Sequence, residues 1–217
     1  MSQKVPVSNN DKRRFPVRKL TMTAMLGAVA TVLMYLSFSV PLMPSFIKLD
    51  LSELPALIAS FALGPVCGVV VCLIKNLINL CFTTTGGVGE LSNFLLGAIF
   101  VFTAGMFYRH MGGRRGALIG SLAGAAMMAV LSVFTNYFVV YPIYTAFMPM
   151  DAILGMYQAI NPNVKNLWDA LIWFNMPFTF IKGLISVVIT FLIYKKISPL
   201  LKGRKKDSPV SYTHLTL

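Results

Sequence analysis

Two clusters of polar side chains flank the apolar run 54–74 and could bind a small polar solute. The cluster before the run combines a cation with three oxygen-bearing side chains: Lys48, Asp50, Ser52 and Glu53. The cluster at its end joins a second cation to two amides: Lys75, Asn76 and Asn79. Buried polar groups are costly without partners, so a chain that only sits in a membrane has no use for either cluster. We take Lys48, Asp50, Lys75 and Asn79 as candidate ligand contacts, and it stays open whether Lys75 touches ligand or only supports the loop.

Lys182 is the one charged residue of the apolar stretch 170–194. A lysine in the middle of a membrane span costs about 2.5–3.5 kcal/mol on insertion scales, so it usually faces a cavity or a partner. One interpretation is structural, with Lys182 paired to Asp50 or Glu53. The other is functional, with its ammonium donating hydrogen bonds to a ligand carbonyl or ring nitrogen.

Asparagines within apolar sequence form a further candidate set. Asn136 is flanked by Tyr137 and Phe138, and Asn93 lies early in the apolar stretch 91–108. An intramembrane asparagine often only joins helices, and that interpretation remains for each of them. An amide also offers both a donor and an acceptor, which suits the edge of a heterocycle. A few of the many aromatic residues, Tyr141 among them, could stack on a flat ligand, and most of the others are typical of lipid-facing or interfacial positions.

Several chemistries are absent from the sequence. It contains no G-x-x-x-x-G-K-[ST] segment that would bind ATP phosphates. The two histidines, His110 and His214, stand alone, and no Ser/His/Asp grouping is evident. The sequence therefore predicts no enzyme, no metal site and no cofactor.

Composition and charge placement indicate a membrane protein. Hydrophobic residues make up 56% of the 217 residues and charged residues only 12%, about half of what a soluble domain carries. Fifteen of the 19 Lys and Arg residues lie in three flanking patches, at 4–19, 109–115 and 195–206. This distribution follows the positive-inside rule and argues against a nucleic-acid-binding surface, despite the net charge of +12.

The apolar stretches predict an all-α integral membrane protein with six transmembrane helices. The expected segments are 20–40, 54–64, a third from Pro65, 91–108, a fifth ending near Tyr141-Pro142, and 170–194. Gly64-Pro65 could interrupt one helix or reverse the chain, because proline removes a backbone donor. Both ends are strongly basic and should be cytoplasmic, which requires an even number of crossings. We therefore expect a reversal at Gly64-Pro65 and the longest external connection at 142–168.

The domain organisation follows from these segments. We expect a basic cytoplasmic N-terminal segment at 1–19, a six-helix membrane domain at 20–198 and a basic C-terminal tail at 199–217. The membrane pattern ends after Lys206, and SYTHLTL looks like a translated sequencing-adapter artefact, so residues 207–217 are interpreted as non-native. Small residues at Ala24, Gly27 and Ala28 permit close helix approach, either within the chain or to another membrane subunit.

The segments that carry the polar residues resemble a known family. KLDLSELPALIASFALGPVCGVVVCLIKNLIN, GGVGELSNFLLG, NYFVVYP and PFTFIKG are similar to the riboflavin-specific substrate-binding subunits (S components of the RibU type) of energy-coupling-factor (ECF) transporters. The similarity runs from about Leu20 to Lys196. It implies six helices around a ligand pocket that is open to the outside and roofed by the 41–53 loop.

The resemblance also implies ligand, partners and site residues. The ligand would be riboflavin, or flavin mononucleotide (FMN), and the family's flavin contacts match Asn136 and Lys182. Some relatives carry an asparagine where this chain has Thr179, and Asn175, one turn earlier, could supply the missing amide. The partners would be a transmembrane coupling protein, contacted through Ala24, Gly27 and Ala28, and two cytoplasmic ATPase subunits.

Two alternatives remain at this point. The same kind of subunit could capture another vitamin or a nucleobase-like solute. The chain could instead be a structural or assembly protein of the membrane whose polar residues only hold helices together.

Overall fold

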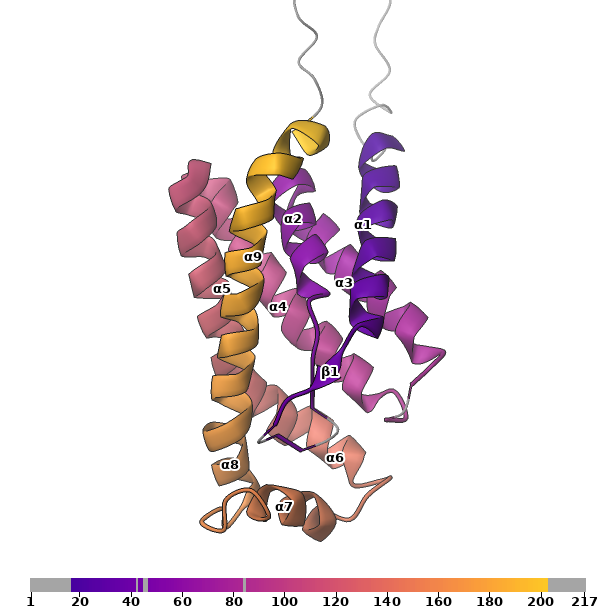
Figure 1. The fold of residues 1–217 in the computed structure, drawn as a ribbon, viewed down its shortest axis with the longest axis vertical. Coiled ribbons are helices and arrows are strands. Elements are labelled where there is room, and N and C mark those ends of the chain that lie inside the picture. The colour runs from indigo at the N-terminus through magenta and orange to yellow at the C-terminus, as the bar shows by residue number, and fades with distance from the viewer. Residues whose placement is uncertain (1–16, 42, 45–46, 84, 203–217) are drawn as a thin grey trace, which may run out of the picture.

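The fold is a bundle of helices with one short pair of strands (Figure 1). The structure is a computed structural model and describes residues 17–41, 43–44, 47–83 and 85–202. The helical elements in chain order are α1 (Val17–Tyr35), α2 (Glu53–Leu63), α3 (Pro65–Leu80), α4 (Val88–Met111), α5 (Gly113–Thr135), η2 (Asn136–Val140), α6 (Tyr141–Tyr144), α7 (Met150–Gln158), α8 (Leu167–Ala170), η3 (Leu171–Asn175) and α9 (Met176–Lys202). Residues 1–16 and 203–217, including the segment interpreted as non-native, lie outside the described residues.

Four helical stretches are long and apolar enough to cross a membrane. They are Val17–Tyr35, Val88–Met111, Gly113–Tyr144 and Leu167–Ile193, and the two shorter apolar helices are α2 and α3. The predicted all-α membrane class is therefore confirmed. A count of six crossings needs α2 and α3 as well, and it stays a prediction.

The chain reverses between α2 and α3, as the sequence predicts. Gly64 has φ +115°, which a side chain would disfavour, and Pro65 opens α3, where its missing N–H is not needed. On either side of the turn the two helices nearly touch. A Cβ on Gly68 would lie 2.8 Å from Ser60 Cβ and 2.9 Å from the Ala56 carbonyl oxygen.

Helices α4 and α5 also pack closely, through small residues. A Cβ on Gly120 would lie 2.6 Å from the carbonyl oxygen of Ala104, and one on Gly124 would lie 2.6 Å from that of Phe100. Around this contact lies the main core, which includes Ala56, Leu57, Val71, Phe100 and Met128. Many other large apolar side chains are exposed on the outside of the bundle, where lipid would cover them.

Two π-helical turns occur where proline interrupts long helices. The turn η2 comes directly before α6, which contains Pro142, and η3 comes directly before α9, which contains Pro177. Proline has no N–H to donate to the carbonyl four residues earlier, and its ring clashes with that carbonyl. A π-helical turn is locally wider, which makes room for the ring and changes the hydrogen-bond partners there. The fifth segment therefore passes Pro142 and ends at Tyr144, near the predicted end at Tyr141-Pro142.

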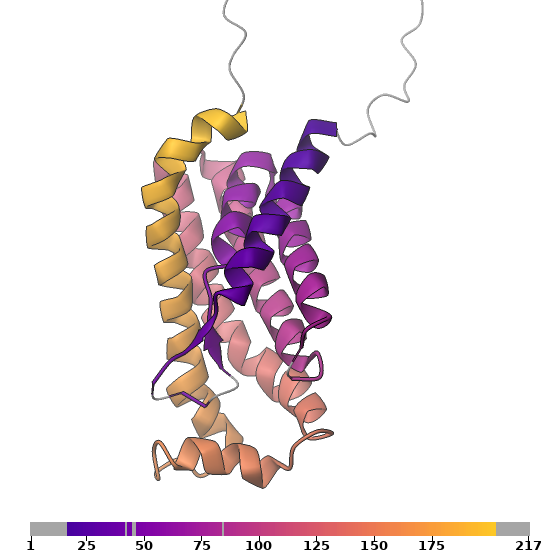
Figure 2. The ribbon, with the colours of Figure 1, turned by 45° about the vertical axis from the view of Figure 1, so that its right-hand side comes forward.

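The two ends of the bundle differ. The start of α1 and the end of α9 lie at the same end, while α7 crosses the opposite end (Figures 1 and 2). Near the middle, Phe38–Ser39 (β1) and Lys48–Leu49 (β2) form an antiparallel pair, with Phe38 opposite Leu49 and Ser39 opposite Lys48. This hairpin was not expected, because the first segment was predicted to run to residue 40, whereas α1 ends at Tyr35.

Candidate ligand-binding site

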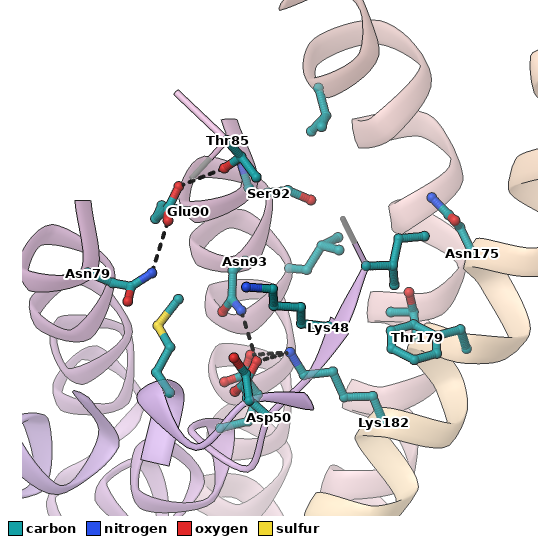
Figure 3. Close-up of a pocket in the computed structure, with 18 of the residues that line it drawn as sticks. Lys48, Asp50, Asn79, Thr85, Glu90, Ser92, Asn93, Asn175, Thr179 and Lys182 are labelled. Atoms are coloured by element: carbon teal, nitrogen blue, oxygen red, sulfur yellow. Dashed lines mark hydrogen bonds and ion pairs between the residues drawn. The ribbon is translucent and has the colours of Figure 1, made fainter. Parts of the chain in front are cut away.

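A cavity of about 310 Å³ lies between the last turns of α1 and α3 and the first turns of α4 and α9. Its wall comes from the end of α1, the hairpin and the loop after it, the start of α2, the end of α3, and from α4, α5, η2, α6, η3 and α9. The lining residues are Met34, Tyr35, Ser37, Ile47, Lys48, Asp50, Glu53, Asn79, Phe82, Thr85, Gly89, Glu90, Ser92, Asn93, Leu96, Met128, Asn136, Val140, Tyr144, Asn175, Phe178, Thr179 and Lys182. Figure 3 shows several of their polar groups directed into one space.

The floor of the cavity is a group of paired charges, here called the ion cluster: Asp50, Ser52, Glu53, Lys75 and Lys182. Lys182 Nζ lies 2.9 Å from Asp50 Oδ2 and 3.6 Å from Glu53 Oε1. Lys75 pairs with Glu53 and also donates to the Ser52 hydroxyl. The Ser52 amide donates to Asp50 Oδ1 at 2.9 Å. Two ammonium groups thus balance two carboxylates, and the cluster ties the loop before α2 to α3 and α9.

Asp50 stays ionised in this cluster. Burial alone would raise the pKa of its carboxyl, but the ammonium groups of Lys182 and Lys75, with the hydrogen bond from Ser52, hold the pKa well below its usual range. The floor of the cavity therefore carries a fixed negative charge on Asp50, which Lys182 already pairs with.

Helix α4 approaches the ion cluster closely because it has a glycine there. A Cβ on Gly97 would lie 3.2 Å from Glu53 Oε1 and 3.3 Å from Cys72 Sγ. Any side chain at this position would press against the buried carboxylate.

Three amides, here called the amide set, line the wall above: Asn93, Asn136 and Asn175. Asn93 Nδ2 donates to Asp50 Oδ2 at 3.3 Å. Asn136 Oδ1 accepts from the Ser92 hydroxyl at 3.1 Å, and Asn175 Oδ1 accepts from the Tyr157 hydroxyl at 2.9 Å. Each amide keeps hydrogen-bonding capacity beyond these contacts.

A third polar group surrounds Glu90 on the side of α3 and α4. Its carboxylate accepts from Asn79 Nδ2 at 2.9 Å, from the Thr83 hydroxyl at 2.8 Å and from the Thr85 hydroxyl at 3.2 Å. Figure 3 shows Asn79, Thr85 and Glu90 together at one side of the cavity. These bonds hold the α3–α4 connection against the wall.

Comparison with known proteins assigns the chain to a family. The family described as "ECF transporter, substrate-specific component" matches residues 18–194. The chain belongs to this family. The match covers nearly the whole range in which the sequence resembles the S components, so that recognition is confirmed, and the protein is a multi-pass protein of the cell membrane.

Individual relatives of this S component include two named riboflavin transporters and one solved structure. It is 32% identical over 185 residues to "Riboflavin transporter RibU" of Staphylococcus aureus (strain TCH60), which covers 85% of this chain and 93% of the relative. It is 30% identical over 192 residues to "Riboflavin transporter FmnP" of Bacillus subtilis (strain 168), covering 87% and 96%. A solved structure described as "Structure and mechanism of the S component of a bacterial ECF transporter" superposes with a TM-score of 0.69 at 32% identity, covering 86% of this chain and 99% of the other.

The structure brings eight of the ten predicted site residues of this S component to the cavity wall. They are Lys48, Asp50, Asn79, Asn93, Asn136, Asn175, Thr179 and Lys182. The other two lie behind the wall. Lys75 is fully buried in the ion cluster, and Tyr141 is buried with its hydroxyl 2.6 Å from that of Tyr157.

The structure bears on whether Lys182 and Lys75 contact the ligand or only support the fold. The predicted pairing of Lys182 with Asp50 or Glu53 is confirmed for both partners, and Lys182 also lines the cavity. Lys75 supports the loop through Ser52 and Glu53.

The small residues on α1 do not share one environment. Ala24 and Ala28 are exposed, whereas Gly27 is buried. A Cβ on Gly27 would lie 3.0 Å from Ile74 Cγ2, so in this chain the glycine serves the contact between α1 and α3.

Sequence reasoning missed several polar residues at the site. Glu90, Ser92 and Thr85 line the cavity. The segment T-T-T-G-G-V-G-E could have indicated the contact between the threonines and Glu90, because Ser and Thr hydroxyls form local hydrogen bonds at turns. Tyr157 lies in the connection 142–168, and its hydroxyl contacts Asn175 from a distant part of the chain. No sequence pattern marks it. Among the described residues there is no group of three or more His, Cys, Asp or Glu that could hold a metal ion.

Proposed function

We propose that this S component captures riboflavin from outside the cell and delivers it across the membrane. The observation that carries the proposal is the convergence of eight separately predicted polar residues on one cavity. Its volume of about 310 Å³ falls within the range of small-molecule sites, about 300–1,000 Å³. The two relatives described above are both named riboflavin transporters.

The cavity offers the kinds of groups that a flavin requires. The polar edge of the flavin ring presents carbonyl oxygens, ring nitrogens and one N–H. The side chains of Asn136, Asn175, Thr179 and Lys182 offer hydrogen-bond donors from η2, η3 and α9. The apolar side chains of Leu96, Met128 and Phe178 are suited to the flat ring. FMN is a second ligand to test, because Lys48 is a cation on the wall with no ion pair within the described part of the chain.

We further propose six membrane crossings with both chain ends in the cytoplasm and the cavity facing outward. Support comes from the basic patches at 4–19 and 195–206, together with the common end at which α1 begins and α9 ends. The cavity lies toward the opposite end, at the last turns of α1 and α3 and the first turns of α4 and α9. Helix α2 spans only 11 residues, about 16 Å, and is buried along most of its length by neighbours.

ATP hydrolysis is assigned to separate subunits. The sequence has no phosphate-binding loop of the G-x-x-x-x-G-K-[ST] type, so release into the cell would be driven by two cytoplasmic ATPase subunits through a transmembrane coupling protein. The exposed Ala24 and Ala28 on α1 suit a close helix contact with that coupling protein.

Quenching of riboflavin fluorescence by the purified protein in detergent tests the proposal. We expect quenching by the wild type that saturates as riboflavin is titrated in, and that added thiamine or biotin leaves unchanged. A protein that is folded by circular dichroism yet causes no quenching would refute riboflavin capture.

A further inference from the structure

The amides of Asn136 and Asn175 share an unusual setting. Asn136 is the first residue of η2 and Asn175 is the last residue of η3, so both π-helical turns place an amide on the cavity wall. Both side chains are nine-tenths or more buried, at 5% and 6% exposure. In each case a hydroxyl from another element contacts the amide oxygen.

Asn175 belongs to a closed ring of three hydrogen-bonding groups. The Tyr157 hydroxyl donates to Asn175 Oδ1 at 2.9 Å, and it lies 2.6 Å from the Tyr141 hydroxyl. Asn175 Nδ2 lies 3.5 Å from the same Tyr141 oxygen and donates to it. A hydroxyl has one proton, so when Tyr157 donates to Asn175, Tyr141 must donate to Tyr157. The ring then runs in one direction and fixes which end of the amide is the oxygen.

Tyr157 is well suited to hold this orientation. It projects from α7 and is fully buried. Burial, followed by the nearby Tyr141, raises the pKa of the Tyr157 phenol well above its ordinary value, so the phenol remains a donor. Because α7 crosses the end of the bundle (Figure 2), Tyr157 links that helix to the wall of the cavity.

Asn136 is held by a single hydrogen bond instead of a ring. The Ser92 hydroxyl from α4 donates to Asn136 Oδ1 at 3.1 Å. Ser92 itself lines the cavity, and Figure 3 shows it beside Thr85 at the upper wall.

These contacts set the polarity of the wall. With both amide oxygens engaged, Asn136 and Asn175 have N–H groups left for a ligand. Asn93 is opposite in character, because its Nδ2 donates to Asp50 and its buried Oδ1 has no hydrogen-bond partner within the described residues. The wall therefore offers hydrogen-bond donors at Asn136 and Asn175, whereas the amide donor of Asn93 is already bound to Asp50.

We propose that Tyr157 and Ser92 are positioning residues that orient these two amides with their N–H groups toward the ligand. The site then selects a ligand with hydrogen-bond acceptors facing Asn136 and Asn175, which the carbonyl and imine groups of a flavin supply. This inference rests on the proposed function, since riboflavin is the ligand through which it is tested.

Double-mutant cycles test whether each hydroxyl acts through its amide. The variants are Tyr157→Phe, Asn175→Ala and their combination, and Ser92→Ala, Asn136→Ala and their combination, each titrated with riboflavin. We expect Tyr157→Phe and Ser92→Ala each to weaken binding about tenfold, and to have almost no further effect once the partner amide is already alanine. Tyr137→Phe and Ser132→Ala are matched controls, because neither residue lines the cavity.

A spectroscopic readout separates positioning from general destabilisation. An N–H bonded to a flavin carbonyl lowers the C=O stretching frequency, so the infrared band of bound riboflavin should move to higher frequency in Tyr157→Phe and Ser92→Ala and stay in place in the two controls. If Tyr157→Phe does not fold, the cycle of Ser92→Ala and Asn136→Ala tests the positioning role alone. The inference is overturned if the losses of binding free energy add in both cycles, or if the carbonyl band does not move. The proposed function still stands in that case as long as the wild type binds riboflavin. Absence of wild-type binding refutes both.

Discussion

The ion cluster and the amide set are neighbouring polar groups that differ in how completely their hydrogen-bonding atoms are paired within the protein. In the ion cluster, Lys75, Glu53 and Ser52 bind one another and are almost completely buried. In the amide set, Asn93 Oδ1 has no partner within the described residues, and Asn136 and Asn175 have N–H groups beyond their contacts with hydroxyls. A polar group that is fully paired holds the fold, while one with remaining capacity can bind a ligand.

This contrast predicts that changes in the ion cluster affect stability first, and changes in the amide set affect binding first. Lys182 belongs to the ion cluster and also lines the cavity, so it should affect both.

The largest effect is expected for Lys75→Met. The change leaves the Glu53 carboxylate buried, with Lys182 as its remaining cation at 3.6 Å. Breaking a buried ion pair from one side costs about 3–5 kcal/mol of unfolding free energy, which denaturant titration in detergent micelles would measure. The double variant Lys75→Met/Glu53→Leu removes both charges and should recover part of the loss. A single variant as stable as the wild type would mean that the cluster does not hold the fold.

Lys182→Ala should weaken both stability and binding. It removes the cation 2.9 Å from Asp50 and a donor on the cavity wall, so we expect riboflavin affinity to fall at least tenfold, equivalent to about 1–3 kcal/mol. Calorimetric titration combined with a thermal unfolding scan would check the two effects together. Loss of stability with unchanged affinity would assign Lys182 to the structure alone.

Gly97→Ala should destabilise the protein moderately by crowding the ion cluster. The new methyl group would stand 3.2 Å from Glu53 Oε1, and overpacking of this kind costs about 1–3 kcal/mol. Gly155→Ala on α7 is the matched control, since a Cβ there meets nothing within 4 Å. Equal unfolding midpoints for the two variants would contradict the close approach of α4 to Glu53.

The smallest expected effect is that of mild acid on Asp50. Its folded-state pKa is lowered, so its contribution to stability is fully present above the unfolded-state value of about 3.9 and is lost only as pH falls through the folded-state pKa. The difference in unfolding midpoint between wild type and Asp50→Asn should therefore stay constant from about pH 7 to about pH 5. A difference that shrinks within this range would show that Lys182 does not hold the carboxylate ionised.

Much of the architecture was readable from the sequence because it depends on local signals. Gly64-Pro65 predicted the reversal between α2 and α3, and long uncharged stretches predicted the helices that cross the membrane. The end of the fifth segment was predicted only approximately, near Tyr141-Pro142, because proline normally ends a helix. The π-helical turn η2 carries the helix past it to Tyr144, and hydropathy alone does not reveal such a turn.

The site was predictable where polar residues stand out against apolar sequence. Asn136, Lys182 and Asp50 were identified in this way and all line the cavity. Tyr157 and Ser92 were not, because a tyrosine in a connection and a serine at a helix start are ordinary in sequence. Their importance comes from contacts across 18 and 44 residues, which only the fold establishes.

Calorimetric titration of riboflavin into the wild type, Asn136→Ala and Ser132→Ala tests the central claim most directly. Asn136 is on the cavity wall, whereas Ser132 lies one turn earlier on α5, does not line the cavity, and donates its hydroxyl to the Ala129 carbonyl. The account predicts that Asn136→Ala binds at least tenfold more weakly than the wild type, and that Ser132→Ala binds equally well. Equal affinity of Asn136→Ala and the wild type would contradict it.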